Sequence, residues 1–138
     1  FFGKLFGLTD LSSRVPERLE RVGLAKRATS LTRTLSRGMR QRLALARTLL
    51  HDPDFVLLDE PYTGLDAHAA AVLREVLESL KNGRRTVVLV THNISQGLEL
   101  ADRVAILVRG RLVSMEDRGK MDPGAFEVRY RKQVEGSD

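Results

Sequence analysis

The sequence of 138 residues contains no cysteine. Disulfide bonds, thiolate chemistry and zinc sites built from cysteine are therefore excluded. It also contains no apolar run close to the 18 or so residues that a membrane-spanning helix needs. Its cleanest apolar stretches, such as 87–90, have the length of a strand. With 42% hydrophobic and 30% charged residues, the chain has the balance of an ordinary globular domain, or of part of one.

The charge of the chain is moderately positive, with 23 Lys and Arg against 18 Asp and Glu and a formal net charge of +5. Such an excess could suit nucleic acid, anionic lipid or the phosphates of a nucleotide. The basic residues are spread along the sequence without a run of five or more. We therefore interpret most of them as solvated faces of helices and expect no nucleic-acid partner.

The spacing of apolar residues predicts helices that alternate with strands. The helices are expected over residues 16–22, 38–50, 67–80 and 94–101, and the strands over 55–58, 86–90 and 104–108, with a hairpin that returns at 112–114. The strands 55–58 and 86–90 are apolar on both faces, as expected of the interior of a sheet. The alternation implies an α/β fold with a parallel core. The charged tail from Glu116 shows only a weak apolar pattern, at Phe126, Val128 and Tyr130.

Proline and glycine mark the ends of two of these helices. Pro16 stands near the start of the first helix and Gly23 just past its end, while Asn82 and Gly83 are expected to end the helix over 67–80. In that helix the spacing of the larger apolar residues turns one face toward the core, namely Leu73, Val76, Leu77 and Leu80.

Two adjacent carboxylates, Asp59 and Glu60, follow the strand 55–58. In open α/β sheets, ligands bind at the carboxyl ends of the strands. At such a place Asp59 could bind Mg²⁺, which takes one or two carboxylates together with substrate phosphates. Glu60 could accept a proton from an attacking water. Taken alone, the same pattern also fits a strand followed by an ordinary acidic turn.

Two further segments could meet a phosphate. Ser36 is suited to cap the helix that follows it, and Gly38 lets a ligand approach the backbone closely. The free N–H groups and the dipole at that helix start favour an anion. His92 comes just after the strand 86–90, where it can hydrogen-bond a phosphate or orient a water. Taken alone, these patterns also fit a plain capped helix and a partly buried structural histidine.

In their order and spacing, these segments resemble the ATP-binding-cassette (ABC) family of ATPases. The distance of 32 positions from Glu60 to His92 (92 − 60) is the one that such cassettes usually have. The matches are, in chain order, to the signature motif, the Walker B strand with its catalytic glutamate, the D-loop and the switch histidine: Leu35–Arg42, Phe55–Glu60, Thr63–Asp66 and His92.

The resemblance covers about residues 1–115 and implies a P-loop NTPase-like fold in which a parallel-core sheet is flanked by helices. Residues 1–50 are expected to carry part of the helical subdomain with the signature helix. Residues 51–115 would form the α/β core with the Walker B strand, the D-loop and the switch histidine. Residues 116–138 would be a C-terminal tail.

The sequence departs from the family pattern in two ways. The usual signature has two glycines and then a glutamine, whereas here Arg37 replaces the first glycine and Met39 the glutamine. Ser36 and Gly38 are left as the expected phosphate contacts. No G-x-x-x-x-G-K-[ST] occurs, so no P-loop cradles the phosphates, and the family's glutamine loop is also missing. Both are expected before Phe1, and the 138 residues by themselves are expected to be inactive.

The resemblance implies that two cassettes sandwich two molecules of ATP with Mg²⁺, and that hydrolysis drives transmembrane permease subunits. The chain would lie peripherally at the cytoplasmic face of a bacterial membrane, as a dimer with a second ABC ATPase subunit. The implied roles are a magnesium ligand, two catalytic residues and four nucleotide contacts: Asp59; Glu60 and His92; and Ser36, Gly38, Gln41 and Asp66.

The opening segment Phe1–Leu8, the variant signature and the short C-terminus resemble the haem-exporter ATPase of cytochrome c maturation. Similar openings occur in short cassettes that export drugs or sodium. The expected function is therefore export, of haem for cytochrome c biogenesis or alternatively of a drug, sodium or another small substrate. A rival is an ABC ATPase that acts on DNA or ribosomes, but the chain shows neither coiled-coil heptads nor a second cassette.

Overall fold

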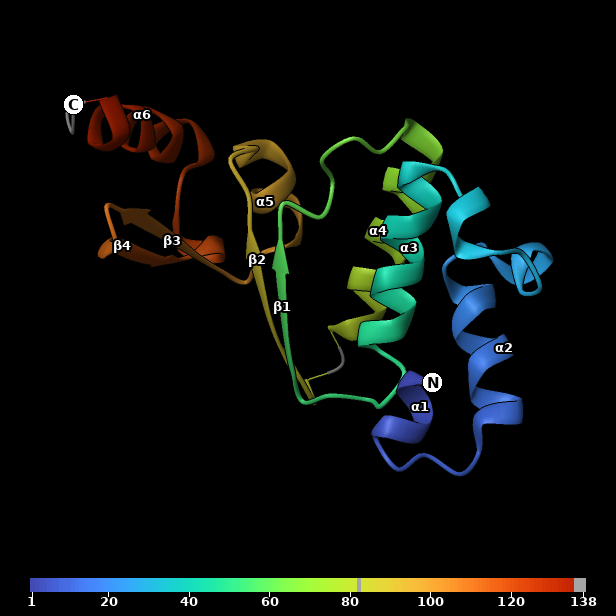
Figure 1. The fold of residues 1–138 in the computed structure, drawn as a ribbon. Coiled ribbons are helices and arrows are strands. Elements are labelled where there is room, and N and C mark those ends of the chain that lie inside the picture. The colour runs from blue at the N-terminus through green and yellow to red at the C-terminus, as the bar shows by residue number, and fades with distance from the viewer. Residues whose placement is uncertain (82, 136–138) are drawn as a thin grey trace. The chain divides into compact units, whose positions relative to one another are not determined.

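The computed structural model describes residues 1–81 and 83–135, so Asn82, expected at the end of a helix, lies outside the described residues. The chain divides into two units, Phe1–Val90 and Thr91–Asp138 (Figure 1). The mixed α/β class that the sequence predicts is confirmed, because helices and a parallel pair of strands share the first unit. The division into residues 1–50, 51–115 and 116–138, which was expected from the motifs, stays a prediction.

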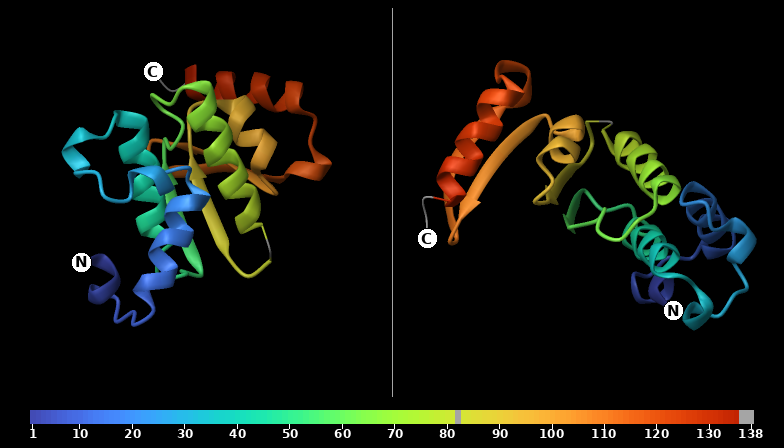
Figure 2. Two further views of the ribbon diagram at one scale, coloured as in Figure 1. Left: turned by 90° about the vertical axis from the view of Figure 1, so that its right-hand side faces the viewer. Right: turned by 90° about the horizontal axis from the view of Figure 1, so that it is seen from above.

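Three helices form the body of the first unit, and α3 lies between α2 and α4 (Figures 1 and 2). They are preceded by the short α1, and two 3₁₀ turns connect α2 to α3. The bounds are Phe2–Leu5 for α1, Leu11–Arg21 for α2, Ala25–Arg27 for η1, Thr32–Thr34 for η2, Arg37–Thr48 for α3 and Ala67–Leu80 for α4. The inward face predicted for α4 is confirmed, since all four of its residues are buried: Leu73, Val76, Leu77 and Leu80.

The prediction that the first helix begins at Pro16 is wrong, because α2 begins at Leu11 and holds Pro16 in its interior. The first turn forms before the chain reaches the proline. Arg14 donates its backbone N–H to the carbonyl of Asp10 at 3.1 Å, and its guanidinium binds the Asp10 carboxylate at 2.9 Å. The expected glycine past the helix end is confirmed, since Gly23 has φ +66, a conformation that favours glycine.

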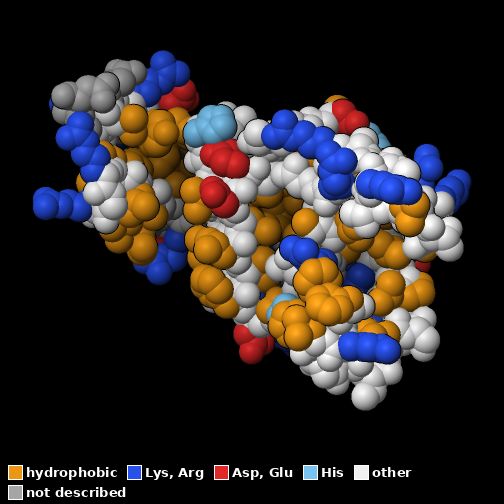
Figure 3. Space-filling view, viewed as in Figure 1, with side chains coloured by type: hydrophobic (Ala, Val, Ile, Leu, Met, Phe, Trp, Pro, Cys, Tyr) orange, Lys and Arg blue, Asp and Glu red, His pale blue; other side chains and the backbone are white. Residues whose placement is uncertain are grey.

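The strands β1 (Phe55–Asp59) and β2 (Thr86–Val90) pair in parallel, as the sequence predicts, with Asp59 opposite Val90. One face of the pair packs on the helices through Val56, which is buried. The other face is open to solvent although it is apolar, and hydrophobic side chains are visible there at the surface (Figure 3). We call this open side the exposed sheet face; it carries Phe55, Leu57, Val88 and Val90.

The second unit begins with α5 (Ile94–Leu100), followed by β3 (Arg103–Val108) and β4 (Arg111–Asp117), which pair antiparallel. The predicted hairpin is therefore confirmed, and β4 is longer than expected. Arg109 and Gly110 both have positive φ, 47 and 77. Two such residues make the tight turn whose twist matches that of the strands.

A helix closes the second unit where the sequence suggested only a weak apolar pattern. After the 3₁₀ turn η3 (Arg118–Lys120), α6 spans Pro123–Glu135 and lies along the β3–β4 hairpin (Figure 2). The sequence predicts no helix in this tail, and the structure forms one in which Phe126 packs with the buried side chains of Leu98 and Ile106. Within residues 1–81 and 83–135, no helix is both long and apolar enough to cross a membrane.

Candidate nucleotide-binding site

The carboxyl end of β1 presents two carboxylates in different settings. Asp59 is the last residue of the strand and is exposed; its side chain makes no hydrogen bond or ion pair with the described residues. Glu60 is half-buried, with φ 45, which is uncommon for a residue other than glycine. Its N–H donates to the carbonyl of Val90 at 2.9 Å, and its carboxylate accepts the hydroxyl of Thr63 at 3.2 Å. The backbone and Thr63 thus fix the direction of Glu60.

The start of α3 has the capped geometry that the sequence predicts. Ser36 is the N-cap, and its Oγ accepts the N–H of Met39 at 3.2 Å. Gly38 faces the next helix, since a Cβ placed on it would stand 3.6 Å from Leu65 and 3.8 Å from Ala69. Backbone N–H groups at such a helix start can bind an anion.

The loop 61–66 connects β1 to α4 and touches the start of α3. Gln41 of α3 donates from its side-chain amide to the carbonyl of Pro61, and the guanidinium of Arg37 lies against Gly64. At the end of the loop, Asp66 is the N-cap of α4 and accepts the N–H of Ala69 at 2.7 Å. Of the predicted nucleotide contacts, Gln41 and Asp66 therefore both have an internal partner.

A hollow of about 180 Å³ lies between α3 and the end of β1. Its lining includes Gln41, Asp59, Pro61 and Leu65, so two of the predicted site residues share one concave surface. With Ser36 and Gly38 on the same helix start and Glu60 and Asp66 at the two ends of the loop, six predicted residues belong to one connected region of the first unit.

His92 belongs to the second unit, two residues after the end of β2. Its side chain is exposed. Hydrogen bonds of the two neighbouring residues fix the backbone on either side of it. The N–H of Asn93 donates to the hydroxyl of Thr91 at 3.0 Å, and the side chain of Asn93 caps α5 by accepting the N–H of Gln96 at 3.1 Å. The grouping of His92 with Glu60 stays a prediction.

The residues fit a magnesium ion only if a nucleotide completes its coordination. Among residues 1–81 and 83–135, no three His, Asp or Glu side chains gather into a metal cluster. Asp59 alone offers an unengaged carboxylate at the end of β1. Because Mg²⁺ commonly takes one or two carboxylates plus substrate phosphates, a single hard oxygen ligand suits a nucleotide-bound ion.

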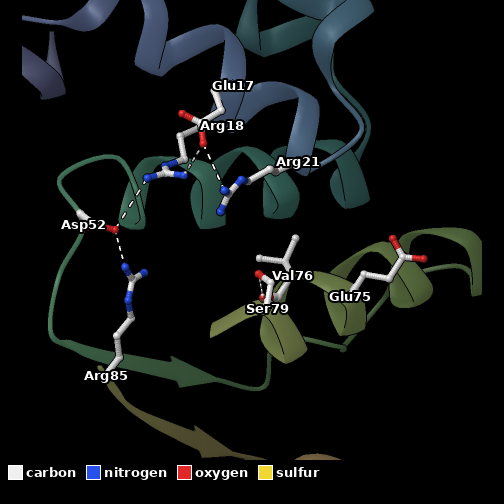
Figure 4. Close-up of a pocket in the computed structure, with 8 residues that line it drawn as sticks. All are labelled: Glu17, Arg18, Arg21, Asp52, Glu75, Val76, Ser79 and Arg85. Atoms are coloured by element: carbon white, nitrogen blue, oxygen red, sulfur yellow. Dashed lines mark hydrogen bonds and ion pairs between the residues drawn. The ribbon is translucent and has the colours of Figure 1, made fainter. Parts of the chain in front are cut away.

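A second hollow of about 500 Å³ lies at the other end of the strands, before β1 and β2 begin (Figure 4). Asp52 binds Arg85 and, at 3.7 Å, Arg18; the hydrogen bond from Arg85 lowers the pKa of the Asp52 carboxyl. Three arginines and three carboxylates line the hollow and cancel in charge: Arg18, Arg21 and Arg85 with Glu17, Asp52 and Glu75. All of them except Glu75 join ion pairs with one another. We interpret it as an ion-pair network that ties α2 to the two strands. Sequence reasoning missed this network because its members come from three separate segments.

Comparison with known proteins places these features in context. Residues 10–95 match the family model described as "AAA domain, putative AbiEii toxin, Type IV TA system". The chain is 40% identical over 115 residues to the "Nod factor export ATP-binding protein I" of Cupriavidus metallidurans, covering 82% of this chain and 38% of that protein.

Two further relatives have similar coverage. The "ABC transporter ATP-binding protein NatA" of Bacillus subtilis is 34% identical, over 82% of this chain and 47% of that protein. A "Fluoroquinolones export ATP-binding protein" of Mycobacterium tuberculosis is 38% identical, over 86% of this chain and 39% of that protein. The chain thus spans less than half the length of each of these three relatives.

Proposed function

We propose a function from the premise that this chain belongs to the AAA-domain family and, within it, to the ATP-binding proteins of ABC transporters. As part of the complete protein, it binds and hydrolyses ATP to power transport across a membrane. The observation that supports this most strongly is the pair of carboxylates at the end of β1, one unengaged and one fixed by Thr63.

The two carboxylates have separate roles in this proposal. Asp59 binds the Mg²⁺ that accompanies the nucleotide and neutralises charge on its phosphates. Glu60 orients the attacking water and accepts its proton. The hydrogen bond from Thr63 and the left-handed backbone at Glu60 support a fixed position for that base.

The start of α3 contacts the nucleotide of a second, identical or related subunit. Ser36 and Gly38 meet the γ-phosphate through the hydroxyl and the backbone N–H groups. Gln41 and Asp66 belong to the same contact surface, because both are tied to the loop 61–66 that lies beside it. The proposed role of His92 is a hydrogen bond to the γ-phosphate. Two such subunits would enclose two molecules of ATP.

The complete protein works at the cytoplasmic face of a membrane with transmembrane permease subunits. The names of relatives as ABC transporter ATP-binding proteins support this assignment. Several are named for export and one for phosphate import, so the names favour export as the direction without excluding import. Haem is the cargo suggested by the opening segment Phe1–Leu8 and the variant signature. A drug is the second candidate, because one relative is named for fluoroquinolone export.

Substitution of the base tests the ATPase proposal in the complete protein. Glu60→Gln keeps the shape of the side chain but cannot accept a proton, so we expect kcat to fall roughly 10²–10⁴-fold. Binding of Mg-ATP should persist because Asp59 is unchanged. The matched control is Glu75→Gln, an exposed glutamate of α4, which should keep the wild-type rate. Near-normal turnover of Glu60→Gln would rule the role out.

The cargo can be tested on the complete transporter in lipid vesicles. A transported compound should stimulate ATP hydrolysis and accumulate on the opposite side of the membrane. Haem and a fluoroquinolone are compared at equal concentrations, with the Glu60→Gln transporter as the control for passive leakage. Stimulation and ATP-dependent accumulation of the fluoroquinolone alone would eliminate haem.

A further inference from the structure

The guanidinium of Arg37 occupies the space beside the backbone of Gly64. A Cβ placed on Gly64 would stand 2.9 Å from Cζ and 3.0 Å from Nε of Arg37, which is closer than side-chain carbons approach other atoms. The planar group therefore lies on the glycine where any other residue would carry its side chain. Gly64 also has φ +75, so glycine suits this position for its backbone as well.

The side chain of Arg37 makes this contact without a polar partner in the described part of the chain. Its guanidinium has no hydrogen bond or ion pair with residues 1–81 and 83–135. A planar, weakly hydrated guanidinium can pack flat against a flat group, which a lysine ammonium cannot do. The contact with Gly64 is therefore one of shape, and it depends on arginine at one position and glycine at the other.

The residue before Gly64 is linked to the carboxylate of Glu60. Thr63 donates its hydroxyl to Glu60 at 3.2 Å and its N–H to the carbonyl of Glu60 at 3.1 Å. The loop is also held at Pro61 by Gln41 and at Asp66 by the cap of α4. Between these two ends, Arg37 is the side chain of α3 that packs on the middle of the loop.

We propose that Arg37 is a positioning residue, which holds Gly64 so that the hydroxyl of Thr63 keeps the carboxylate of Glu60 in its productive direction. This inference rests on the role of Glu60 proposed above. Arg37 affects the chemical step through the loop and not by contact with the nucleotide bound by its own chain. It therefore influences kcat and leaves the KM for ATP unchanged.

The test uses the complete protein and three variants of the contact. Arg37→Ala removes the guanidinium, and we expect kcat to fall roughly tenfold, because a catalytic group misplaced by about 1 Å can lower a rate by up to about 10²-fold. The KM for ATP should stay within about twofold of wild type. Arg37→Lys keeps the positive charge without the flat group, and kcat should be as low as for Arg37→Ala.

Gly64→Ala disrupts the same contact by changing its second partner, because the new methyl group displaces the guanidinium of Arg37. Its matched control is Gly83→Ala, since Gly83 has φ +74 and no neighbouring atom within 4 Å of the added Cβ. Both variants strain the backbone alike, and we expect only Gly64→Ala to lose kcat. The double variant Arg37→Ala with Gly64→Ala should be no slower than the slower single variant, because both remove one interaction.

The outcomes separate this inference from the function on which it rests. If Glu60→Gln is inactive while Arg37→Ala keeps the wild-type kcat, the positioning role is wrong and the ATPase assignment stands. A raised KM, a full rate in Arg37→Lys, or losses that multiply in the double variant would each overturn it too. If Glu60→Gln hydrolyses ATP normally, the proposed function fails and the inference fails with it. If Gly64→Ala does not fold, the kcat values of Arg37→Ala and Arg37→Lys still test the positioning role of Arg37.

Discussion

Residues of the same chemical type have different surroundings in this chain, and the surroundings indicate their roles. Asp59 is exposed at the end of β1 without a partner among the described residues, as a ligand for an incoming cation should be. Asp52 instead joins two arginines before the strands begin, and Asp66 caps a helix. Sequence alone presents all three as acidic residues beside an element boundary.

A substitution at Gly38 tests the proposed contact between two subunits. Gly38→Asp brings a negative charge to the start of α3, close to where the γ-phosphate of the second subunit's nucleotide should dock. We expect each complete subunit to bind ATP normally, the ATP-driven dimer to be lost, and hydrolysis to fall with it. Size-exclusion chromatography with a non-hydrolysable ATP analogue measures the dimer. A dimer that forms as in wild type would contradict the placement of Gly38 at the interface.

The ion pairs of Asp52 predict a dependence of stability on pH. Because Arg85 lowers the pKa of Asp52 below 3.8, the pair stabilises the fold above that pH and ceases to do so as pH falls through the lowered pKa. Asp52→Asn should therefore lower the free energy of unfolding at pH 7, by no more than about 1 kcal/mol because the carboxylate is 52% exposed. Asparagine tolerates the positive φ of this position, so the change isolates the charge.

Thermal unfolding of the complete protein at a series of pH values measures this effect. The difference between wild type and Asp52→Asn should narrow below pH 4. Asp54→Asn is the matched control, since Asp54 is exposed and its carboxylate has no ion pair with the described residues. A constant difference at all pH values would show that the charge of Asp52 is not responsible.

At the scale of elements, α6 shows how a helix can depend on a small number of packed residues. Asp122 caps its first turn by accepting the N–H of Ala125 at 2.6 Å, and Pro123 follows at the first helical position, where proline is favoured. These two signals were present in the sequence. Among the described side chains of the helix, Phe126 is buried and Tyr130 packs beside it half-buried, whereas Val128 is 67% exposed, so the apolar pattern stays weak.

Truncation of Phe126 tests whether this side chain holds α6 on its unit. Phe126 is 3% exposed and packs with Leu98 and Ile106, so Phe126→Ala should destabilise the unit by about 3–5 kcal/mol. We expect the amides of α6 to lose protection in hydrogen exchange of the complete protein. Val128→Ala, on the exposed side of the same helix, should leave that protection unchanged. Equal protection in both variants would show that other contacts hold the helix.

At the scale of the whole molecule, the exposed sheet face leaves large apolar side chains of β1 and β2 in contact with solvent. Phe55 and Leu57 are 59% and 60% exposed, although each large apolar side chain left in water forfeits about 1.5–3 kcal/mol. The chain also covers only 38% of its Cupriavidus relative. We therefore expect the complete protein to contribute further residues that cover this face.

The isolated 138 residues should consequently be marginal in stability and prone to associate, since exposed apolar strands are templates for aggregation. The complete protein should give a higher soluble yield than the isolated 138 residues. Leu57→Thr, which keeps strand propensity and removes apolar surface, should reduce association of the isolated chain. Analytical ultracentrifugation and thermal unfolding measure both effects. A reversible, monomeric transition above about 60 °C would contradict the expectation.

The sequence by itself determined the elements whose signals are local. Runs of apolar residues specified β1 and β2, because strands of parallel sheets are typically apolar on both faces. Ser36 and Gly23 marked ends of α3 and α2, since capping depends on a few neighbouring residues. The order of Ser36, Asp59, Glu60, Asp66 and His92 was enough for the family, because each motif is short and continuous.

Tertiary structure decided what depends on residues far apart in the chain. Two sets of contacts join separate segments: Arg37 with Gly64, and Arg18 and Arg85 with Asp52. No local sequence pattern could predict them. The same holds for the packing of α6 against β3, which joins Phe126 to Ile106. Local signals specify elements because capping and periodicity act over a few residues, whereas the direction of Glu60 depends on a loop that is held by another helix.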